Sequence, residues 1–235
     1  MTEPRYAVYF APHARDSLAI AGSHWLGRDA IGNVMLPQPA CPGLVPARLA
    51  ELTAMARRYG LHATLKPPFR LQPGHAVQQL EAAVQALAAT RTPFEFHVEL
   101  SMLDGFLAWT PRDAQAQLAS VAAACVMQLD DFRQPPDAAE LARRRKALTL
   151  GQEAMLQRWG YPFVLDEFRF HITLSDPVAG VEADAMSKAL TGITLALADT
   201  PQTFDSLCLF VEPAPGAPLR LHARFGFDGS VTRHG

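Results

Sequence analysis

Short apolar runs alternate with longer amphipathic segments along the chain. Residues 6–11, 61–66 and 169–175 are short, rich in apolar side chains and closely followed by proline. Runs of this length that stop at proline suit strands better than helices. In residues 94–100 every second side chain is apolar, which is the period of a strand with one wet face. These four segments therefore predict strands.

Apolar side chains three or four residues apart fill the intervals between these strands. This spacing is typical of helices that bury one face. Pro46 suits the first position of a helix, and Asp137 suits the cap that precedes one. The pattern predicts helices over residues 14–26, 46–59, 74–89, 113–129, 137–159 and 181–190.

The order of the predicted elements repeats. Each half of the chain has a short strand carrying His-x-Thr, then a helix, then two strands that can form a hairpin. The hairpins pair residues 94–100 with 106–110 and residues 203–211 with 219–227. We infer an internal duplication within a single bilobal domain over residues 1–235.

Composition and charge restrict the class of protein. The chain is 49% hydrophobic and 19% charged, which excludes disorder, and its net charge of -2 creates no global field for long nucleic acid or an anionic membrane. We expect neither a membrane helix nor a signal peptide. Cys41, Cys125 and Cys208 lack the spacing of a disulfide or zinc framework. We therefore expect a cytoplasmic protein with a small ligand and no obligate protein partner.

Two four-residue motifs carry the candidate chemistry, His62-Ala63-Thr64-Leu65 and His171-Ile172-Thr173-Leu174. Successive side chains of a strand point to opposite faces, so the His and Thr of each motif share a polar face and the other two residues share a core face. If a two-fold axis relates the halves, the polar faces oppose each other across one cleft.

Two imidazoles and two hydroxyls around one ligand suit phosphodiester cleavage. A neutral imidazole can take a proton from the attacking water while an imidazolium protonates the leaving oxygen, and the threonines can donate to the phosphoryl oxygens. Which histidine is the base stays open. This scheme needs no metal or other cofactor, and the motifs offer no adjacent carboxylate for a metal site. Lys66 and Arg169 are predicted on the same strand faces, where they either neutralise phosphate or are solvated charges.

With these motifs the chain resembles the 2H phosphoesterases, a family with two His-x-Thr/Ser motifs about a hundred residues apart; here the histidines are 109 positions apart. Residues 57–71 (RRYGLHATLKPPFRL) and 168–177 (FRFHITLSDP) are similar to the branch of that family named for phosphonate metabolism. The resemblance implies an α+β bilobal duplicated fold, with two antiparallel sheets and outer helices around a central cleft. It also implies metal-independent cyclic phosphodiesterase or RNA 2′,5′-ligase-type chemistry, and it assigns His62, Thr64, His171 and Thr173 to the site.

The resulting hypothesis is a phosphoesterase that hydrolyses a cyclic phosphodiester in a small phosphorylated metabolite, with the link to phosphonate metabolism resting on resemblance alone. One alternative is an enzyme acting on RNA ends, as a 2′,3′-cyclic phosphodiesterase or a 2′,5′-ligase-like enzyme. Another is a non-catalytic phosphate- or nucleotide-binding module. The proline-rich segment 37–46 is a candidate lid, with an exposed Cys41. Arg58 and Tyr59 are weaker site candidates. The basic run 143–146 is interpreted mainly as a solvated helix face, with contact to a phosphorylated substrate as the alternative.

Overall fold

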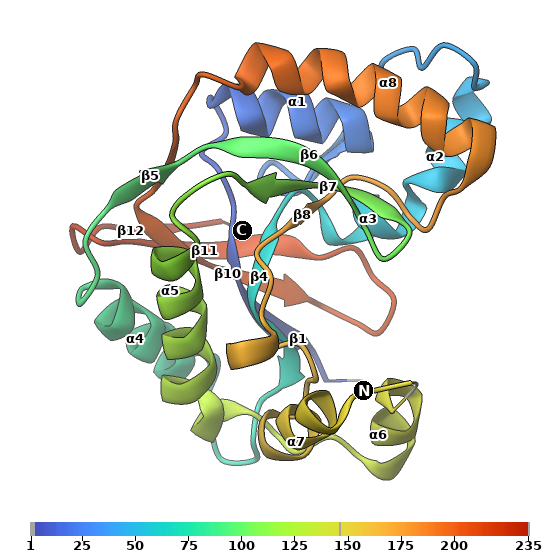
Figure 1. Cartoon of the computed structure of the whole chain (residues 1–235). Helices are drawn as coiled ribbons and strands as arrows, with labels where there is room; N and C mark the ends of the chain where they lie inside the picture. Colours follow the sequence, from blue (N-terminus) through green and yellow to red (C-terminus); the bar gives the residue numbers. More distant parts are fainter. Residues whose placement is uncertain (1–2, 146, 235) are drawn as a thin grey trace.

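One antiparallel sheet of eight strands organises the molecule (Figure 1). The computed structural model describes residues 3–145 and 147–234. The strand order is β12-β11-β10-β1-β4-β8-β7-β6. The strands of this sheet are β1 (Arg5–Phe10), β4 (Ala63–Arg70), β6 (Val98–Leu103), β7 (Phe106–Pro111), β8 (Ile172–Thr173), β10 (Ser206–Glu212), β11 (Arg220–Gly226) and β12 (Val231–Arg233).

Two short ladders accompany the large sheet. One pairs β2 (Arg28–Asp29) with β3 (Val34–Met35). The other pairs β5 (Phe94–Phe96) with β9 (Gln202–Phe204), the segments that lead into β6 and β10. Because β5 and β9 join the approaches to strands on opposite sides of the central β4–β8 pair, they hold the large sheet in a curve (Figure 1).

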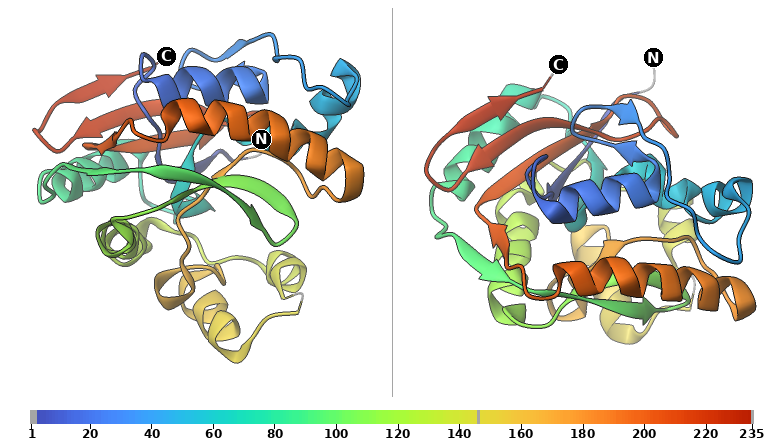
Figure 2. Two further views of the ribbon diagram at one scale, coloured as in Figure 1. Left: turned by 45° about the horizontal axis from the view of Figure 1, so that its top comes forward. Right: turned by 90° about the horizontal axis from the view of Figure 1, so that it is seen from above.

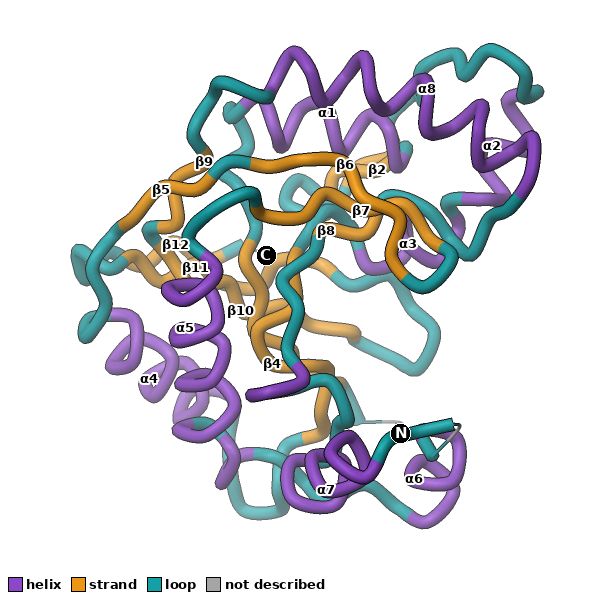
Figure 3. The backbone as a smooth tube through the Cα atoms, in the orientation of Figure 1, coloured by secondary structure: helices purple, strands orange, loops and turns teal. Residues whose placement is uncertain are grey.

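Helices lie on the outside of the strands (Figure 3). The helices α1 and α8 lie side by side on one side of the sheet (Figure 2). Helix α5 packs on β4, and its neighbour α4 packs on β10 and β11. The two short helices α6 and α7 lie together in Figure 1, near the start of β1. The helices are α1 (Ser17–Leu26), α2 (Pro46–Leu52), α3 (Ala54–Tyr59), α4 (Val77–Ala88), α5 (Gln115–Gln128), α6 (Ala138–Arg144), α7 (Leu150–Trp159) and α8 (Gly180–Leu197).

The predicted order of strand, helix and hairpin occurs in both halves. The first motif strand, β4, is followed by α4 and the β6–β7 hairpin, and the second, β8, is followed by α8 and the β10–β11 hairpin. Each hairpin lies beside the motif strand of the other half of the chain or next to its neighbour. The β6–β7 hairpin pairs with β8, whereas β10 pairs with β1, which lies beside β4. The structure is thus of mixed α+β class with a large antiparallel sheet.

The expectation of two separate antiparallel sheets facing across a cleft is wrong for the described strands. Strand β4 pairs directly with β8, with Ala63 opposite Ile172, so the strands of both halves belong to one sheet. The backbone groups at the ends of each half-sheet need hydrogen-bond partners, and each motif strand supplies them to the other.

A bulge in β4 alters which side chains share a face. Tyr9 lies opposite Thr64 and Val8 opposite Lys66, so Leu65 is an extra residue in β4. A bulge of this kind turns two successive side chains toward the same side of a sheet. Leu65 and Lys66 are consequently both buried. The prediction that Lys66 shares the face of Thr64 is wrong.

Lys66 is instead part of the packing beneath α5. Its ammonium donates to the carbonyl of Val126 at 3.0 Å and lies 3.3 Å from a carboxylate oxygen of Asp130. Strand β4 also continues through Pro67 and Pro68 to Arg70. At these two prolines, between Lys66 and Phe69, a second register irregularity interrupts the ladder with β1. The predicted stop before these prolines is therefore also wrong, since an interrupted ladder tolerates residues that cannot donate.

Two predicted helices are divided. The segment 46–59 forms α2 and α3, separated at Thr53, whose hydroxyl donates to the carbonyl of Leu49. The single helix predicted over 137–159 is wrong, because α6 ends at Arg144 and α7 starts at Leu150 after a capping box at Thr149. Of the basic run, Lys146 lies outside the described residues.

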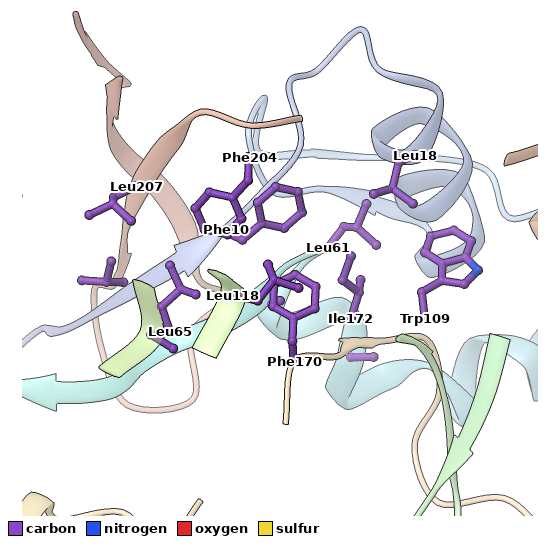
Figure 4. Close-up of a cluster of buried hydrophobic side chains, with 14 of the residues drawn as sticks. Phe10, Leu18, Leu61, Leu65, Trp109, Leu118, Phe170, Ile172, Phe204 and Leu207 are labelled. Atoms are coloured by element: carbon purple, nitrogen blue, oxygen red, sulfur yellow. The ribbon is translucent and has the colours of Figure 1, made fainter. Parts of the chain in front are cut away.

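The main hydrophobic core lies between the sheet and its covering helices (Figure 4). The second residue and the last of each motif, Ala63, Leu65, Ile172 and Leu174, are all buried. The histidine and threonine of each motif are only partly buried. The predicted division of each motif into a core face and a polar face is confirmed by this burial pattern.

The proline-rich segment packs on helix α8. Cys41 is 4% exposed and its thiol lies 3.7 Å from the carbonyl oxygen of Ala185, so the predicted exposure of Cys41 is wrong. The structure describes all of residues 37–46, and none of them lines the cavity that holds the motifs. A lid formed by this segment is not supported. Among the described residues, no helix combines the length and apolarity that crossing a membrane requires.

Candidate active site

His62 is held by its own backbone and by two tyrosine rings. Its Nδ1 lies 2.9 Å from the carbonyl oxygen of Gly60, and its Nε2 lies 3.2 Å from the hydroxyl of Thr64. The ring stacks on Tyr9 with centroids 3.9 Å apart, and Tyr59 lies on it at 6.0 Å. Donation of Nδ1–H to Gly60 leaves Nε2 as the acceptor of the neutral ring, facing Thr64.

His171 has the same local arrangement in the second motif. Its Nδ1 lies 2.8 Å from the carbonyl oxygen of Arg169, again the residue two positions earlier. The ring of Phe106 lies 5.6 Å away at a tilt of 52°. Each motif thus uses a preceding carbonyl to fix its imidazole through Nδ1, which leaves Nε2 as the acceptor nitrogen of the neutral ring.

Pairing of the two motif strands brings the four polar side chains together. Because Ala63 pairs with Ile172 in an antiparallel ladder, His62 lies across from Thr173, and Thr64 across from His171. All four line one cavity of about 500 Å³. The cavity is of a size that proteins commonly use to bind small ligands.

The environment favours neutral imidazoles. Burial lowers the pKa of His62 to about 4, against the opposing effect of the Gly60 carbonyl, and the nearby imidazole of His171 lowers it further. Burial also lowers the pKa of His171, and the charge of Arg169 adds to that effect. Without a ligand, both rings are neutral at pH 7, and an anion placed between them would raise both pKa values.

Arg169 lies at the margin of this site. It lines a second cavity of about 200 Å³ that shares Thr64 and His171 with the first. Its side chain is 61% exposed, with the guanidinium 3.8 Å from a carboxylate oxygen of Asp104. Arg169 can therefore turn toward an anion at His171.

Lys66 lines neither of these two cavities, and its place in the packing below α5 does not fit the phosphate-binding role predicted for it.

Further residues reach the cavity from other parts of the fold. Tyr9 and Arg5 come from β1, Arg144 from the end of α6, and Tyr161 from the loop after α7. The alternation of Arg5, Ala7 and Tyr9 along one strand was a signal that the sequence contained. Arg144 belongs to the basic run 143–146, whose sequence pattern indicates mainly a solvated face. For Tyr161 the sequence holds no such signal, because its place depends on how the loop after α7 docks. Tyr59, a weaker sequence candidate, also lines the cavity, whereas Arg58 pairs with Glu212.

Two polar residues after the second motif have structural partners. The carboxylate of Asp176 accepts the backbone N–H groups of Met55 and Ala56 at the start of α3, at 3.1 and 3.2 Å. The Ser175 hydroxyl accepts the N–H of Leu107 at 2.9 Å. These bonds hold the second motif against α3 and β7, so both side chains position the site. Within the described ranges, no group of three or more His, Cys, Asp or Glu side chains is arranged to hold a metal ion.

The fold and the site define a protein with paired histidines and threonines in one cavity at the centre of an antiparallel sheet. The chain belongs to the family described as "Protein of unknown function (DUF1045)", which matches residues 64–220. That range includes Thr64, all of the second motif, the β6–β7 hairpin and strand β10.

Two curated proteins are similar to nearly the whole chain. One is the "Ribose 1,5-bisphosphate phosphokinase PhnN" of Janthinobacterium sp. (strain Marseille), 38% identical over 235 residues, which are 97% of this chain and 52% of that protein. The other has the same name in Laribacter hongkongensis (strain HLHK9) and is 36% identical over 219 residues, 92% of this chain and 50% of that protein. The chain thus spans about half the length of these relatives.

Proposed function

We propose that the protein is a metal-independent phosphoesterase that hydrolyses a cyclic phosphodiester in a small phosphorylated metabolite. The proposal is supported above all by the pairing of β4 with β8, which brings two imidazoles, each held at Nδ1 by a backbone carbonyl, and two threonines to one cavity. This is the donor and acceptor set that acid–base cleavage of a phosphodiester requires.

In the proposed reaction His62 is the base and His171 the acid. The lower pKa of about 4 keeps His62 neutral, so that its Nε2 can accept a proton from the attacking water. The water oxygen bonds to phosphorus and one ring P–O bond breaks. Protonated His171 gives its proton to the departing alkoxide oxygen, which leaves a phosphate monoester and a free hydroxyl. The hydroxyls of Thr64 and Thr173 donate to the phosphoryl oxygens, where negative charge increases.

A small substrate is favoured by cavity size and by charge. The cavity of about 500 Å³ accommodates a phosphorylated sugar, and the net charge of -2 supplies no broad basic surface for a polymer. The relatives are named for a ribose bisphosphate, which suggests ribose phosphates as the first compounds to test. The link of this chain to phosphonate metabolism is part of the same proposal.

The kinase named in the relatives is a second candidate. Those proteins are about twice as long as the matched region. A nucleotide-binding P-loop needs glycine directly before a lysine, and the three lysines of this chain, Lys66, Lys146 and Lys188, follow Leu65, Arg145 and Ser187. We therefore assign the phosphokinase activity of the relatives to their other half.

The decisive experiment is a turnover screen with ribose cyclic phosphates and nucleoside 2′,3′-cyclic monophosphates in the presence of EDTA. We expect hydrolysis that survives chelation. His62→Ala and His171→Ala should each lower kcat about 10²- to 10⁴-fold, since each removes one proton-transfer group. His97→Ala is the matched control, because His97 pairs with Asp113 away from the cavity.

Near-native turnover in either cavity variant would contradict the two-histidine mechanism. Activity lost in EDTA and restored by a divalent ion would favour a metal hydrolase instead. ATP-dependent phosphorylation of ribose 1,5-bisphosphate by this chain alone would show that the kinase activity belongs to this chain and not to the other half of the relatives.

A further inference from the structure

The cavity extends beyond the histidines to a second group of polar side chains. Arg5 and Tyr9 lie on the same face of β1, with Ala7 between them. Tyr9 stacks on His62. Arg5 lies four residues before Tyr9, so their Cα atoms are about 13 Å apart in an extended strand. Arg144 and Tyr161 line the same cavity, with the guanidinium 5.4 Å from the tyrosine ring centroid. We call Arg5, Arg144 and Tyr161 the arginine end of the cavity.

Positive charge exceeds negative charge around the arginine end. Arg5 and Arg58 both bind the carboxylate of Glu212, which is fully buried. Arg144 and Arg70 share Glu140, at 2.6 and 3.5 Å. Four guanidinium groups therefore share two carboxylates in this part of the described structure.

The positive charge of Arg5 also acts on Arg144. Burial lowers the pKa of Arg144, and the positive charge of Arg5 contributes to that lowering. Like charges held together in a partly buried pocket are unfavourable unless an anion lies between them. A bound anion would remove this repulsion and would gain two charge-assisted donors.

Tyr9 supplies a hydroxyl that lacks a partner. Its side chain is completely buried, and its oxygen makes no hydrogen bond with any group in residues 3–145 or 147–234. An unsatisfied buried hydroxyl costs about 1–3 kcal/mol. Burial raises the pKa of both Tyr9 and Tyr161, so both phenols stay protonated and can donate. An oxyanion in the cavity is an acceptor of the kind that Tyr9 lacks.

We propose that the arginine end binds a second phosphate group of the substrate, a phosphate monoester remote from the reacting cyclic phosphate. The substrate class is then a compact cyclic phosphate that carries one additional phosphate. This proposal rests on the proposed function for the reaction at the histidines, but anion binding by Arg5 and Arg144 can be measured without any turnover.

The test compares methyl ribofuranoside 2,3-cyclic phosphate with and without a phosphate on O5. We expect the added phosphate to raise kcat/KM of the wild-type protein at least tenfold, mostly through KM, as charge-assisted bonds of this kind suggest. In Arg5→Gln and Arg144→Gln the ratio of the two kcat/KM values should fall toward one. Arg143→Gln is the matched control, since Arg143 is the exposed neighbour of Arg144 in α6 and should retain the ratio.

Calorimetry with methyl ribofuranoside 5-phosphate, which has no cyclic phosphate, separates the two proposals. The wild-type protein and a His62→Ala/His171→Ala double variant should bind it, and Arg5→Gln and Arg144→Gln should weaken binding at least tenfold while the folded state, followed by circular dichroism, is retained. Absence of turnover together with this pattern would reject the phosphoesterase and keep the subsite. Equal binding by wild type and both arginine variants, or no binding at all, would overturn the subsite. Arg5 and Arg144 lie on different elements. If one of the two variants does not fold, binding by the other variant alone tests the subsite.

Discussion

At the residue scale, the two histidines acquire their properties from groups that the motif does not contain. The carbonyls of Gly60 and Arg169 fix the two Nδ1 atoms, and the Tyr9 ring covers one face of His62. Removal from water disfavours the charged form of each imidazole. The chemistry of the motif therefore depends on its neighbours as much as on the histidines themselves.

The lowered pKa of His62 predicts a pH-dependent contribution to stability. In the unfolded chain this histidine titrates near its usual pKa of about 6.5, whereas in the folded protein its pKa is about 4. Between these values the unfolded state binds more protons, so the stability contributed by neutral His62 is complete above about pH 6.5 and is lost as the pH falls toward 4.

This contribution is measurable by urea unfolding between pH 4 and 7.5. We expect the free energy of unfolding of the wild-type protein to fall by about 2–3 kcal/mol more than that of His62→Ala over this range. His97→Ala should follow the wild-type curve in shape. Parallel curves for wild type and His62→Ala would show that burial does not disfavour the charged imidazole in the way described.

At the scale of single elements, the bulge in β4 decides which charges reach the cavity. Strict alternation would place Lys66 beside Thr64, but the extra residue Leu65 turns Lys66 toward α5 and Asp130. The same strand thus presents Thr64 to the cavity and an ammonium to the core. Burial lowers the pKa of Lys66 to about 8, which reflects its removal from water.

Lys66→Met tests this arrangement. Methionine keeps the apolar stem, and Asp130 retains two bonds to Arg133, at 2.8 and 3.0 Å, so no carboxylate is left without a partner. We expect kcat/KM on the cyclic phosphate to stay within about threefold of wild type and stability to change by less than about 2 kcal/mol. A loss above about a hundredfold in kcat/KM with normal melting behaviour would show that Lys66 acts in the site rather than in the packing below α5.

At the scale of the whole molecule, charge is concentrated rather than spread. The net charge is -2, yet four arginines gather around Glu140 and Glu212 near one end of the cavity. A localised positive pocket suits a compact anion better than a long polyanion, whose affinity comes mainly from release of counterions along an extended surface.

We therefore expect a sugar cyclic phosphate to have a higher kcat/KM than a short RNA with a 2′,3′-cyclic end. The reaction with the small compound should depend weakly on salt between 50 and 200 mM. The measurement is kcat/KM for both substrates at several salt concentrations. A clear preference for RNA with a steep salt dependence would favour the RNA-end alternative over the small metabolite.

The order of the main strands and helices, and the faces of the two motif strands, followed from the sequence alone. Alternation along a strand is a local property, so the buried positions of Ala63, Leu65, Ile172 and Leu174 followed from the period of two. The repeated order of strand, helix and hairpin was equally visible, because apolar spacing and turn residues act over short distances.

How these parts meet depends on contacts between residues that are far apart in the sequence. Whether the motif strands form one sheet or two depends on which backbone groups pair over long distances, and local periodicity carries no information about partners. The bulge that buries Lys66 arises from the register of β4 against β1. Arg5, Arg144 and Tyr161 are far apart in sequence and meet only because α6 and the loop after α7 dock beside β1. The motifs were therefore predictable from sequence, whereas the charged end of the cavity required the folded chain.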